Sequence, residues 1–322
     1  MTRALITGGA GYLAASLAHD LLAAGRSVRR MHRPGKAAPE APAGAALEDF
    51  VGDVTRREDV ERAVRDVDVV FHLASQTSVY VAEADPEADV TANVLPMLYL
   101  LEACRALGTR PLVIFAGTVT QAGIPKALPV DESALDDPCT IYDVHKLVAE
   151  RYLKHYSRSG FVRGATLRLA NVYGPGPKSS RADRGVLNAM IKKALAGETL
   201  KLYGTGEYLR DYVYVEDAAR AFALAGSSPE AVDGKHFVLG TGEGHTLAHA
   251  VRLVAELVAE RIGRSVPVEH VPPPASLSPI ETRNFVANPG ALRAATGWAP
   301  RVSLRAGISR TIDYFWGMEE RT

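Results

Sequence analysis

Along the first stretch of about 120 residues, short apolar runs alternate with longer stretches in which apolar residues recur at helical spacing. The apolar runs predict strands at residues 4–6, from residue 28 onward, and at 47–51, 67–73 and 112–115. The amphipathic stretches predict helices at residues 11–24, 86–107 and 142–157. Strands separated by helices of this length indicate parallel βαβ units whose sheet is covered on both faces, and therefore an α/β fold.

This regular alternation stops near residue 174. A predicted strand at 165–169 leads into a turn-rich break at 171–177, and helices are predicted beyond it at 186–196 and 247–262. We therefore predict a first domain over 1–173 and a smaller α/β lobe formed mainly by 174–322, with 212–239 returning to the sheet. The Pro-rich stretch at 271–279 is either a lid over a ligand or a surface connection.

Composition narrows the classes of function. The chain has 322 residues, of which 47% are hydrophobic and 23% charged, as is typical of globular proteins. Lys and Arg together number 37, as do Asp and Glu, so no net charge favours binding to nucleic acid or to an anionic membrane. The nine histidines show no ligand spacing with Asp, Glu or Cys, so we expect no metal site.

The location of the protein is indicated by its cysteines and its apolar segments. Cys104 and Cys139 cannot form a disulfide framework, which indicates a reducing compartment. The N-terminal residues lack a charged region followed by a cleavage site, so a signal peptide is not expected. We also expect no apolar stretch of the roughly 18 residues that a membrane helix needs. These observations predict a soluble, cytoplasmic protein.

A glycine-rich turn joins the first predicted strand to the first predicted helix. Gly8 and Gly11 stand in this turn, and Tyr12 and Leu13 follow at the start of the helix. Glycines at these positions permit a tight turn and let backbone N–H groups and the helix dipole face a pyrophosphate. Ala14 occupies the last small position, which requires only close packing of helix and strand. The first domain is therefore predicted to bind a dinucleotide at these four residues.

The choice between NADP and NAD is read at the end of the second strand, about 20 residues beyond the turn. His32 and Arg33 stand there, so no carboxylate is available for the ribose 2′-hydroxyl. The basic run Arg26, Arg29, Arg30, His32 and Arg33 instead offers cations for a 2′-phosphate. This run favours NADP(H), with NAD as the alternative if the run is only a solvated edge of the sheet.

Tyr142 and Lys146 are the candidate catalytic pair. They are four residues apart on a predicted helix, so they share one face. An ammonium beside a phenol lowers the phenol pKa from about 10 and suits it to transfer a proton to a carbonyl or from an alcohol. Thr118, just past the fifth predicted strand, offers a hydroxyl to the same substrate oxygen.

In these motifs the chain resembles the extended short-chain dehydrogenase/reductases, over nearly its whole length. The motifs are TGGAGYLAASL at 7–17, GDV at 52–54, FHLAS at 71–75, YDVHK at 142–146, LRLANVYGPG at 167–176 and RDYVYVEDAARA at 210–221. The resemblance implies a Rossmann fold, a doubly wound parallel sheet, with a C-terminal lobe that binds a nucleotide-diphosphate sugar. It also implies a homodimer in which the helices at 86–107 and 142–157 form the interface.

The resemblance assigns roles to individual residues. Asp53 would contact the adenine ring, Ala74 would lie beside the nicotinamide ribose, and Lys146 would also hold that ribose. The remaining implied cofactor contacts are Val54, Leu73 and Val172. The implied substrate contacts are Thr118, Asn171, Arg184, Asn188, Arg210 and Arg283.

Some of these assignments have structural alternatives. Asn171 could be only a turn residue and Arg210 only a surface charge. Arg283 is a substitute for a second diphosphate-binding arginine, which segment 274–283 does not obviously contain. His145 replaces the serine that commonly precedes the lysine, and is either a second titrating group or a histidine on the helix surface.

The reaction is chosen by residues around the catalytic threonine. Dehydratases of this type have an acidic pair after it, whereas this chain has Val119 and Thr120, which disfavours dehydration. Gln121-Ala122-Gly123 replaces the usual Val-Tyr-Gly of epimerases, and with DRGV at 183–186 it resembles 4-ketoreductases of deoxysugar pathways. We therefore predict NADPH-dependent reduction of a 4-keto nucleotide sugar, with an NAD-dependent epimerase as the alternative and a non-catalytic cofactor-binding sensor as a third reading.

Overall fold

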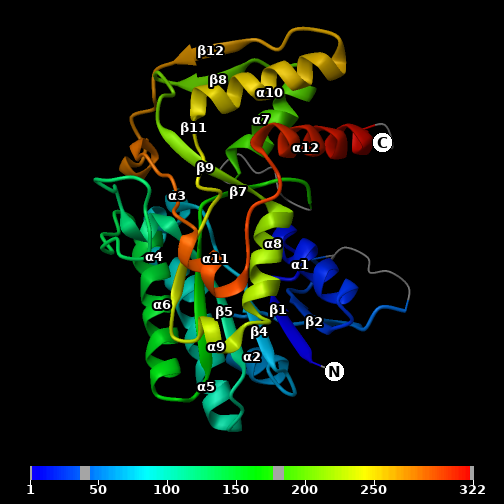
Figure 1. Ribbon diagram of the computed structural model, residues 1–322, viewed down its shortest axis with the longest axis vertical. Coiled ribbons are helices and arrows are strands. Elements are labelled where there is room, and N and C mark those ends of the chain that lie inside the picture. Colours follow the sequence, from blue (N-terminus) through cyan, green and yellow to red (C-terminus); the bar gives the residue numbers. More distant parts are fainter. Residues whose placement is uncertain (1, 37–43, 177–184, 320–322) are drawn as a thin grey trace.

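The computed structural model describes residues 2–36, 44–176 and 185–319. Its larger lobe is built on a seven-stranded sheet of order β10-β6-β5-β4-β1-β2-β3, in which all neighbouring strands are parallel. The strands are β1 (Arg3–Thr7), β2 (Ser27–His32), β3 (Leu47–Val51), β4 (Val69–His72), β5 (Leu112–Thr118), β6 (Arg163–Leu169) and β10 (His236–Leu239). The prediction of a doubly wound Rossmann sheet is confirmed (Figure 1).

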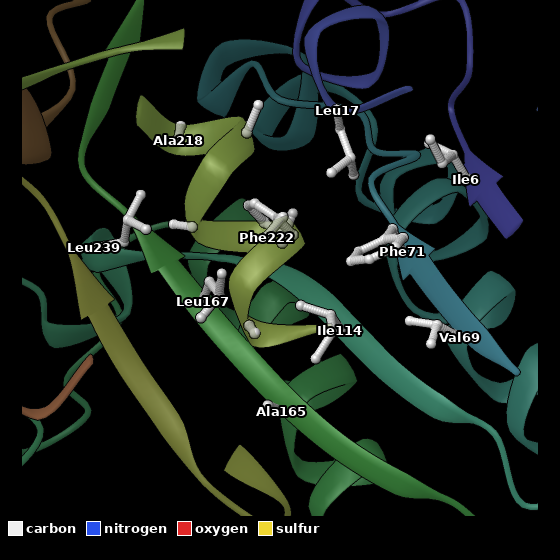
Figure 2. Packing of buried hydrophobic residues seen from close by; sticks show 14 of the residues in the cluster. Ile6, Leu17, Val69, Phe71, Ile114, Ala165, Leu167, Ala218, Phe222 and Leu239 are labelled. Atoms are coloured by element: carbon white, nitrogen blue, oxygen red, sulfur yellow. The ribbon is translucent and has the colours of Figure 1, made fainter. Parts of the chain in front are cut away.

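Helices cover both faces of this sheet because its strands carry apolar side chains on both sides. Ile6 and Phe71 face α1 and α8, where Phe222 of α8 packs against the strands (Figure 2). Leu5 and Val70, one position earlier in each strand, face the opposite layer. The helices of the two layers are α1 (Tyr12–Ala23) and α8 (Val215–Ala225) on one face, and α2 (Arg57–Ala63), α5 (Leu95–Leu107) and α6 (Ile141–Arg158) on the other.

The strand order reverses between β1 and β4, which are neighbours in the sheet although β2 and β3 lie between them in the sequence. In open parallel sheets, ligands bind beyond the carboxyl ends of the strands at such a reversal. The glycine turn follows β1, residues 73–75 follow β4, and Thr118 ends β5. The topology therefore collects these candidate residues at one edge, called here the carboxyl edge.

The smaller lobe stands above the carboxyl edge in Figure 1. Its core includes Tyr173, Tyr214, Val251 and Ile308. Its strands are β7 (Asn171–Tyr173), β9 (Leu209–Tyr214) and β11 (Gly244–Thr246) in one sheet, and β8 (Leu200–Tyr203) and β12 (Val268–Val271) in another. Its helices are α7 (Val186–Leu195), α10 (Leu247–Ile262) and α12 (Leu304–Glu319).

The chain crosses between the lobes after β9. Residues 212–214 belong to β9 of the smaller lobe, whereas α8 packs against α1 and β10 pairs with β6. The larger lobe thus takes a helix and its seventh strand from segment 212–239. The remaining elements are α3 (Val79–Ala84), α4 (Pro86–Asn93), α9 (Pro229–Val232), α11 (Gly290–Thr296) and the 3-10 turns η1 (Val119–Ala122) and η2 (Pro279–Thr282).

The helix predicted at 86–107 is interrupted at Val94, between α4 and α5. Pro96, in the first turn of α5, has no N–H with which to continue the bonding pattern of α4. Taken together, Pro86–Leu107 spans 22 residues and contains an 18-residue window with a mean hydropathy of 1.2, which is long and apolar enough to cross a membrane, so the expectation that no stretch would reach this length is wrong. Of the most apolar 18 residues of this segment, 44% are buried inside the protein. Core helices of soluble proteins can have the same length and apolar composition.

Candidate active site

The turn between β1 and α1 approaches the backbone at the end of β4. Gly8 has a φ of +69°, and a Cβ added there would lie 2.9 Å from the backbone of Ala74, so this position requires glycine. Gly11 caps α1 without a side-chain bond to its first N–H groups. Those donors and the positive end of the helix are left for an anion, which fits the pyrophosphate of a dinucleotide. Tyr12 and Leu13 open α1 at the predicted place.

Thr7 joins the ends of β1 and β4, a role that sequence analysis missed. Its Oγ1 accepts the N–H groups of Leu73 and Ala74 at 3.1 and 3.2 Å and lies 2.9 Å from Nδ1 of His72. Burial and the nearby Lys146 lower the pKa of His72 to about 3, so this ring is neutral and can accept the threonine proton. The bonds fix the backbone of two residues predicted to contact the cofactor, of which Ala74 is the one predicted beside the nicotinamide ribose.

The predicted adenine contact is held in a small network after β3. Oδ1 of Asp53 accepts both the N–H and the hydroxyl of Thr55 at 2.9 Å, and the Asp53 N–H donates to Asp59 at 2.9 Å. Val54 packs against the core beneath α2. On the other side of the turn, the Tyr12 hydroxyl donates to the carbonyl of Val172 at 3.2 Å. The contacts of these residues with a cofactor stay predictions.

The basic residues of β2 are neutralised by the neighbouring strand. Arg30 donates to both carboxylate oxygens of Asp49 at 2.8 and 3.0 Å, and Arg29 donates to Glu48 at 3.1 Å. His32 Nε2 lies 3.7 Å from the same Asp49 carboxylate. Sequence analysis found no carboxylate at this site because Asp49 arrives through the register of β3, opposite Arg30.

These pairings change the basis for cofactor choice. Arg26 donates to Ser227 at 2.8 Å, so it too is engaged within the chain. Arg33 is exposed. Most of the cations that favoured a 2′-phosphate are therefore already bonded to groups of this chain, and the preference for NADP(H) loses much of its support.

Tyr142 and Lys146 lie one turn apart near the start of α6, and both are buried. The Lys146 ammonium lies 4.2 Å from the centre of the Phe115 ring. Burial lowers the pKa of Lys146 to about 7, although Asp89 and Glu150 oppose this shift. A buried cation on the same helix face favours the phenolate form of tyrosine, which suits Tyr142 to proton transfer.

Thr118 is tied to the start of α6 by hydrogen bonds. It ends β5, and its N–H donates to Oε1 of Gln121 at 3.2 Å. Its Oγ1 lies 2.7 Å from that of Thr120, whose hydroxyl bonds to Asp143, the residue after Tyr142. The predicted Thr–Tyr–Lys set thus stands on two elements that are joined directly.

Gln121, which stands where epimerases usually have the Val of Val-Tyr-Gly, has a structural role. Its side chain is 0% exposed and donates to Glu150 at 3.2 Å, beside the Glu150–Arg168 ion pair. Since Gln121 points into this network, its presence bears on the packing of α6 against β5 and β6. It therefore gives no support to 4-ketoreduction over epimerisation.

His145 does not lie on the open surface of the helix, and its role as a second titrating group stays a prediction. Its Nδ1 lies 2.7 Å from Asp89, whose carboxylate also accepts from Gln76 at 2.8 Å and from Asn93 at 2.9 Å. The Asp89 side chain is 0% exposed and that of His145 is 12% exposed. His145 thus joins α6 to α4 through a buried carboxylate.

Two buried arginines of the smaller lobe lie together. Arg210 on β9 and Arg283 after η2 are each 6% exposed. Arg210 donates to the carbonyls of Arg283 and Glu281, and Arg283 donates to the carbonyl of Ile280 at 2.8 Å. Burial and the neighbouring Arg210 lower the pKa of Arg283 to about 10, and its Nε has no hydrogen-bond partner among the described residues. Since Arg210 is buried, the alternative that it is only a surface charge is wrong.

Asn171 opens β7 opposite Tyr212 of β9, two residues from Arg210. Its Oδ1 is buried and, within the described ranges, has no hydrogen-bond partner. The buried polar groups left open on the substrate side are therefore an acceptor and a cationic donor, which suits a ligand carrying both hydroxyl and phosphate groups.

The remaining predictions concern Asn188, Arg184 and metal ions. Asn188 is buried and its amide bonds to both the N–H and the carbonyl of Gly174, at 3.1 and 2.8 Å, so it holds the turn after β7. Arg184 lies outside the described residues. In the part of the chain that the structure describes, no group of three or more His, Cys, Asp or Glu side chains is placed to hold a metal ion.

A seven-stranded Rossmann sheet with a Tyr-x-x-x-Lys pair on the helix after β5 defines an extended short-chain dehydrogenase/reductase. Residues 4–240 match the family described as the NAD dependent epimerase/dehydratase family. The chain belongs to this family.

Similar proteins cover the whole chain. The UDP-glucose 4-epimerase of Mycolicibacterium smegmatis is 32% identical over 324 residues, which cover 97% of this chain and 98% of the relative. The crystal structure of the Thermus thermophilus UDP-glucose 4-epimerase in complex with NAD is 35% identical, with a TM-score of 0.83 and coverage of 98% and 99% of the two chains. That of the Thermotoga maritima enzyme with UDP-glucose is 30% identical, with a TM-score of 0.87 and coverage of 99% and 100%.

Proposed function

We propose that this protein is an NAD-dependent nucleotide-sugar epimerase that inverts C4 of a UDP-hexose. The observation that carries the proposal is that Thr118 at the carboxyl edge is linked through Thr120 to α6, which carries Tyr142 and Lys146, while the buried Arg283 is near enough to Asp143, the residue after Tyr142, to oppose the rise that burial causes in its carboxyl pKa. Relatives similar over nearly the full chain are UDP-glucose 4-epimerases, and two similar solved structures hold NAD and UDP-glucose. This proposal replaces 4-ketoreduction as the favoured reaction.

In this reaction, the glycine turn and the start of α1 would hold NAD, which would supply a reversible hydride acceptor beside C4 of the sugar. Tyr142 accepts the proton of the C4 hydroxyl and gives it back, while Lys146 stabilises the phenolate. Thr118 bonds to the C4 oxygen and helps to hold it beside Tyr142. Since the proton and hydride both return to the substrate, the sugar is inverted with no net oxidation.

The substrate is held by its diphosphate. Arg210 and Arg283 supply two buried cations, and a diphosphate at this site would satisfy the Arg283 Nε that lacks a partner within the described part of the chain. Asn171 offers an acceptor to the hydroxyl groups of the substrate. These contacts leave the hexose to reach toward Tyr142.

The proposal is tested by asking what the purified protein carries and what it converts. Denaturation should release about one NAD per chain, and UDP-glucose should be converted to UDP-galactose without added cofactor. Consumption of NADPH with a 4-keto nucleotide sugar, and no interconversion of the two UDP-hexoses, would instead establish 4-ketoreduction. Bound NAD with neither reaction would favour the sensor reading.

We further propose that the protein forms a homodimer through α5 and α6. Val144 and Tyr152, eight residues apart on α6, are 39% and 36% exposed and share one face. Pairing of this face with its copy would cover both side chains. A Val144→Glu, Tyr152→Glu double variant should elute at half the mass of the wild type in light scattering, and an unchanged mass would contradict the interface.

A further inference from the structure

Asp143 is a buried carboxylate that directly follows Tyr142 and has no role in the steps above. It is 0% exposed. Its Oδ1 accepts the hydroxyl of Thr120, and its Oδ2 accepts that of Thr140 at 2.8 Å. Since Oγ1 of Thr120 lies 2.7 Å from Oγ1 of Thr118, the side chains form an unbroken hydrogen-bond chain from Asp143 to the catalytic threonine.

The charge on Asp143 determines which group donates and which accepts in each of the hydrogen bonds that link Asp143, Thr120 and Thr118. An ionised carboxylate can only accept, so Thr120 must give its one proton to Asp143. In the contact between the two threonines, Thr118 must then be the donor, and its proton is used. Thr118 can offer only lone pairs to a substrate oxygen in this state.

Protonation of Asp143 reverses donor and acceptor in each of these hydrogen bonds. A carboxylic acid can donate to Thr120, which frees the Thr120 proton for Thr118 and the Thr118 proton for the substrate. Thr140 bonds to the other carboxyl oxygen. Its hydroxyl accepts the Asp143 N–H at 3.2 Å as the cap of α6 and donates its proton to Oδ2 at 2.8 Å, an arrangement in which Oδ1 is the oxygen that can carry a proton toward Thr120.

We propose that Asp143 is a positioning residue whose protonation makes Thr118 a hydrogen-bond donor to the C4 oxygen. The inference rests on the proposed function, because in that reaction the C4 oxygen becomes a carbonyl that a second donor stabilises. Tyr142 holds the C4 proton and donates it to this oxygen from one side, and Thr118 is placed to donate from the other only if its own proton is free. Thr118 can be that donor only when Asp143 is protonated.

The groups around Asp143 connect its charge to substrate binding. Burial raises the pKa of the Asp143 carboxyl, while its bonds to Thr120 and Thr140 and the nearby Arg283 oppose this shift. Glu83 of α3 adds to the rise, and Asp143 in turn raises the pKa of Cys139 in the preceding loop. A diphosphate bound at Arg283 would neutralise the cation that favours the carboxylate, so substrate binding would promote protonation.

The protonation state can be read without any turnover. The infrared spectrum of the purified protein with UDP bound should contain the carbonyl band of a protonated carboxyl group near neutral pH. The Asp143→Asn variant should lack this band, whereas the control Asp137→Asn, at an exposed carboxylate nearby, should retain it. A spectrum in which Asp143→Asn removes only carboxylate intensity would overturn the proposal.

The rate of the hydride step gives the second test. On mixing the NAD-loaded enzyme with UDP-glucose, formation of bound NADH should fall about tenfold per pH unit above the pKa of Asp143. Asn in place of Asp143 donates permanently from the position of Oδ1, so the variant should keep the low-pH rate with no such fall. A variant that loses the rate at every pH, while UDP affinity is unchanged, would contradict a directional role.

Thr120, which links Asp143 to Thr118, provides a matched pair of variants. Thr120→Val removes the hydroxyl with little change in shape and should abolish the dependence on Asp143, so that adding Asp143→Asn has no further effect on the pH profile. Thr120→Ser keeps the hydroxyl and should restore the wild-type profile. Equal profiles for Thr120→Val and the wild type would contradict the proposal.

Failure of the proposed function would be recognised separately. If UDP-glucose produced no bound NADH in the wild type, epimerisation would be wrong, and the infrared comparison would still report on Asp143. If bound NADH formed but the pH profiles of wild type and Asp143→Asn coincided, the role of Asp143 would be wrong and epimerisation would stand.

Discussion

On the cofactor side of the carboxyl edge, Thr7 and Arg30 already have partners within the chain, whereas on the substrate side two buried polar atoms have none in the part of the chain that the structure describes. Thr7 is bonded to His72 and to two backbone N–H groups, and Arg30 is bonded to Asp49. Across the edge, Arg283 Nε and Asn171 Oδ1 are buried with no partner among the described residues.

Under the proposed function, the difference reflects how each side would recognise its ligand. A dinucleotide would be met mainly by backbone N–H groups and the end of α1, which leaves side chains there to brace the turns. A buried polar group without a partner costs about 1–3 kcal/mol, and a substrate that supplies the partner recovers that free energy on binding. Four substitutions test this contrast, from the largest expected effect to the smallest.

Replacing Tyr142 with Phe should remove proton transfer and leave both binding sites in place. We expect the rate of epimerisation to fall by about 10³-fold, because general acid–base catalysis contributes on this scale. The NAD content after purification and the affinity for UDP should match those of the wild type. A variant that keeps more than a tenth of the activity would show that another group carries the proton.

Replacing Glu150 with Gln tests a buried carboxylate that, unlike Asn171, already has partners within the chain. Burial alone would raise the pKa of Glu150, but its bonds to Arg168 and Lys154 lower it from 4.5 to about 2. A lowered folded-state pKa contributes stability that is present above the unfolded value and lost as pH falls through the folded one. At neutral pH the free energy of unfolding should therefore fall by about 3 kcal/mol in the variant.

Urea denaturation at several pH values measures this effect. The difference between wild type and Glu150→Gln should be constant near neutral pH and should shrink as pH falls from about 4.5 toward about 2. Equal stability of the two proteins at neutral pH would mean that the buried pair contributes nothing.

Replacing Arg283 with Leu tests the unpaired side. UDP affinity should fall about thirtyfold, since a charge-assisted contact is worth about 2 kcal/mol. The stability without ligand should change by less than about 1 kcal/mol, because the substitution removes a buried cation. Titration calorimetry gives the affinity, and Arg305→Leu, at an exposed arginine, is the matched control. Unchanged UDP affinity in Arg283→Leu would place the diphosphate elsewhere.

Replacing Asp49 with Asn should have the smallest effect. It leaves Arg30 and His32 without their carboxylate and so makes the end of β2 more positive. The affinity of the cofactor-depleted protein for NADP relative to NAD should rise about tenfold, or about 1.4 kcal/mol. If the ratio stays the same, neutralisation by β3 does not determine the choice of cofactor.

Local patterns allowed many individual elements of both lobes to be predicted from the sequence. The strand at 47–51 in the larger lobe and the helix at 247–262 in the smaller one have the predicted bounds, because apolar runs and helical periodicity are properties of neighbouring residues. Thr118, Tyr142 and Lys146 were found for a similar reason, since each stands at a fixed place after a strand or within a helix turn.

The features that were missed depend on residues far apart in the chain. Asp49 meets Arg30 only through the register of β3 on β2. Asp143 meets Thr120 only because α6 packs beside the end of β5. The burial of Arg283 depends on the path of the chain after η2, and a sequence pattern carries no signal for it.

The central claim is that the Thr118–Tyr142–Lys146 set inverts C4 of a UDP-hexose with a cofactor that is not consumed. It is tested most directly by following the anomeric proton signals of UDP-glucose mixed with the purified protein and no added nicotinamide. We expect UDP-galactose to accumulate to an equilibrium mixture and the same mixture to form from UDP-galactose. A spectrum that stays unchanged, from a protein that carries NAD, would contradict the claim.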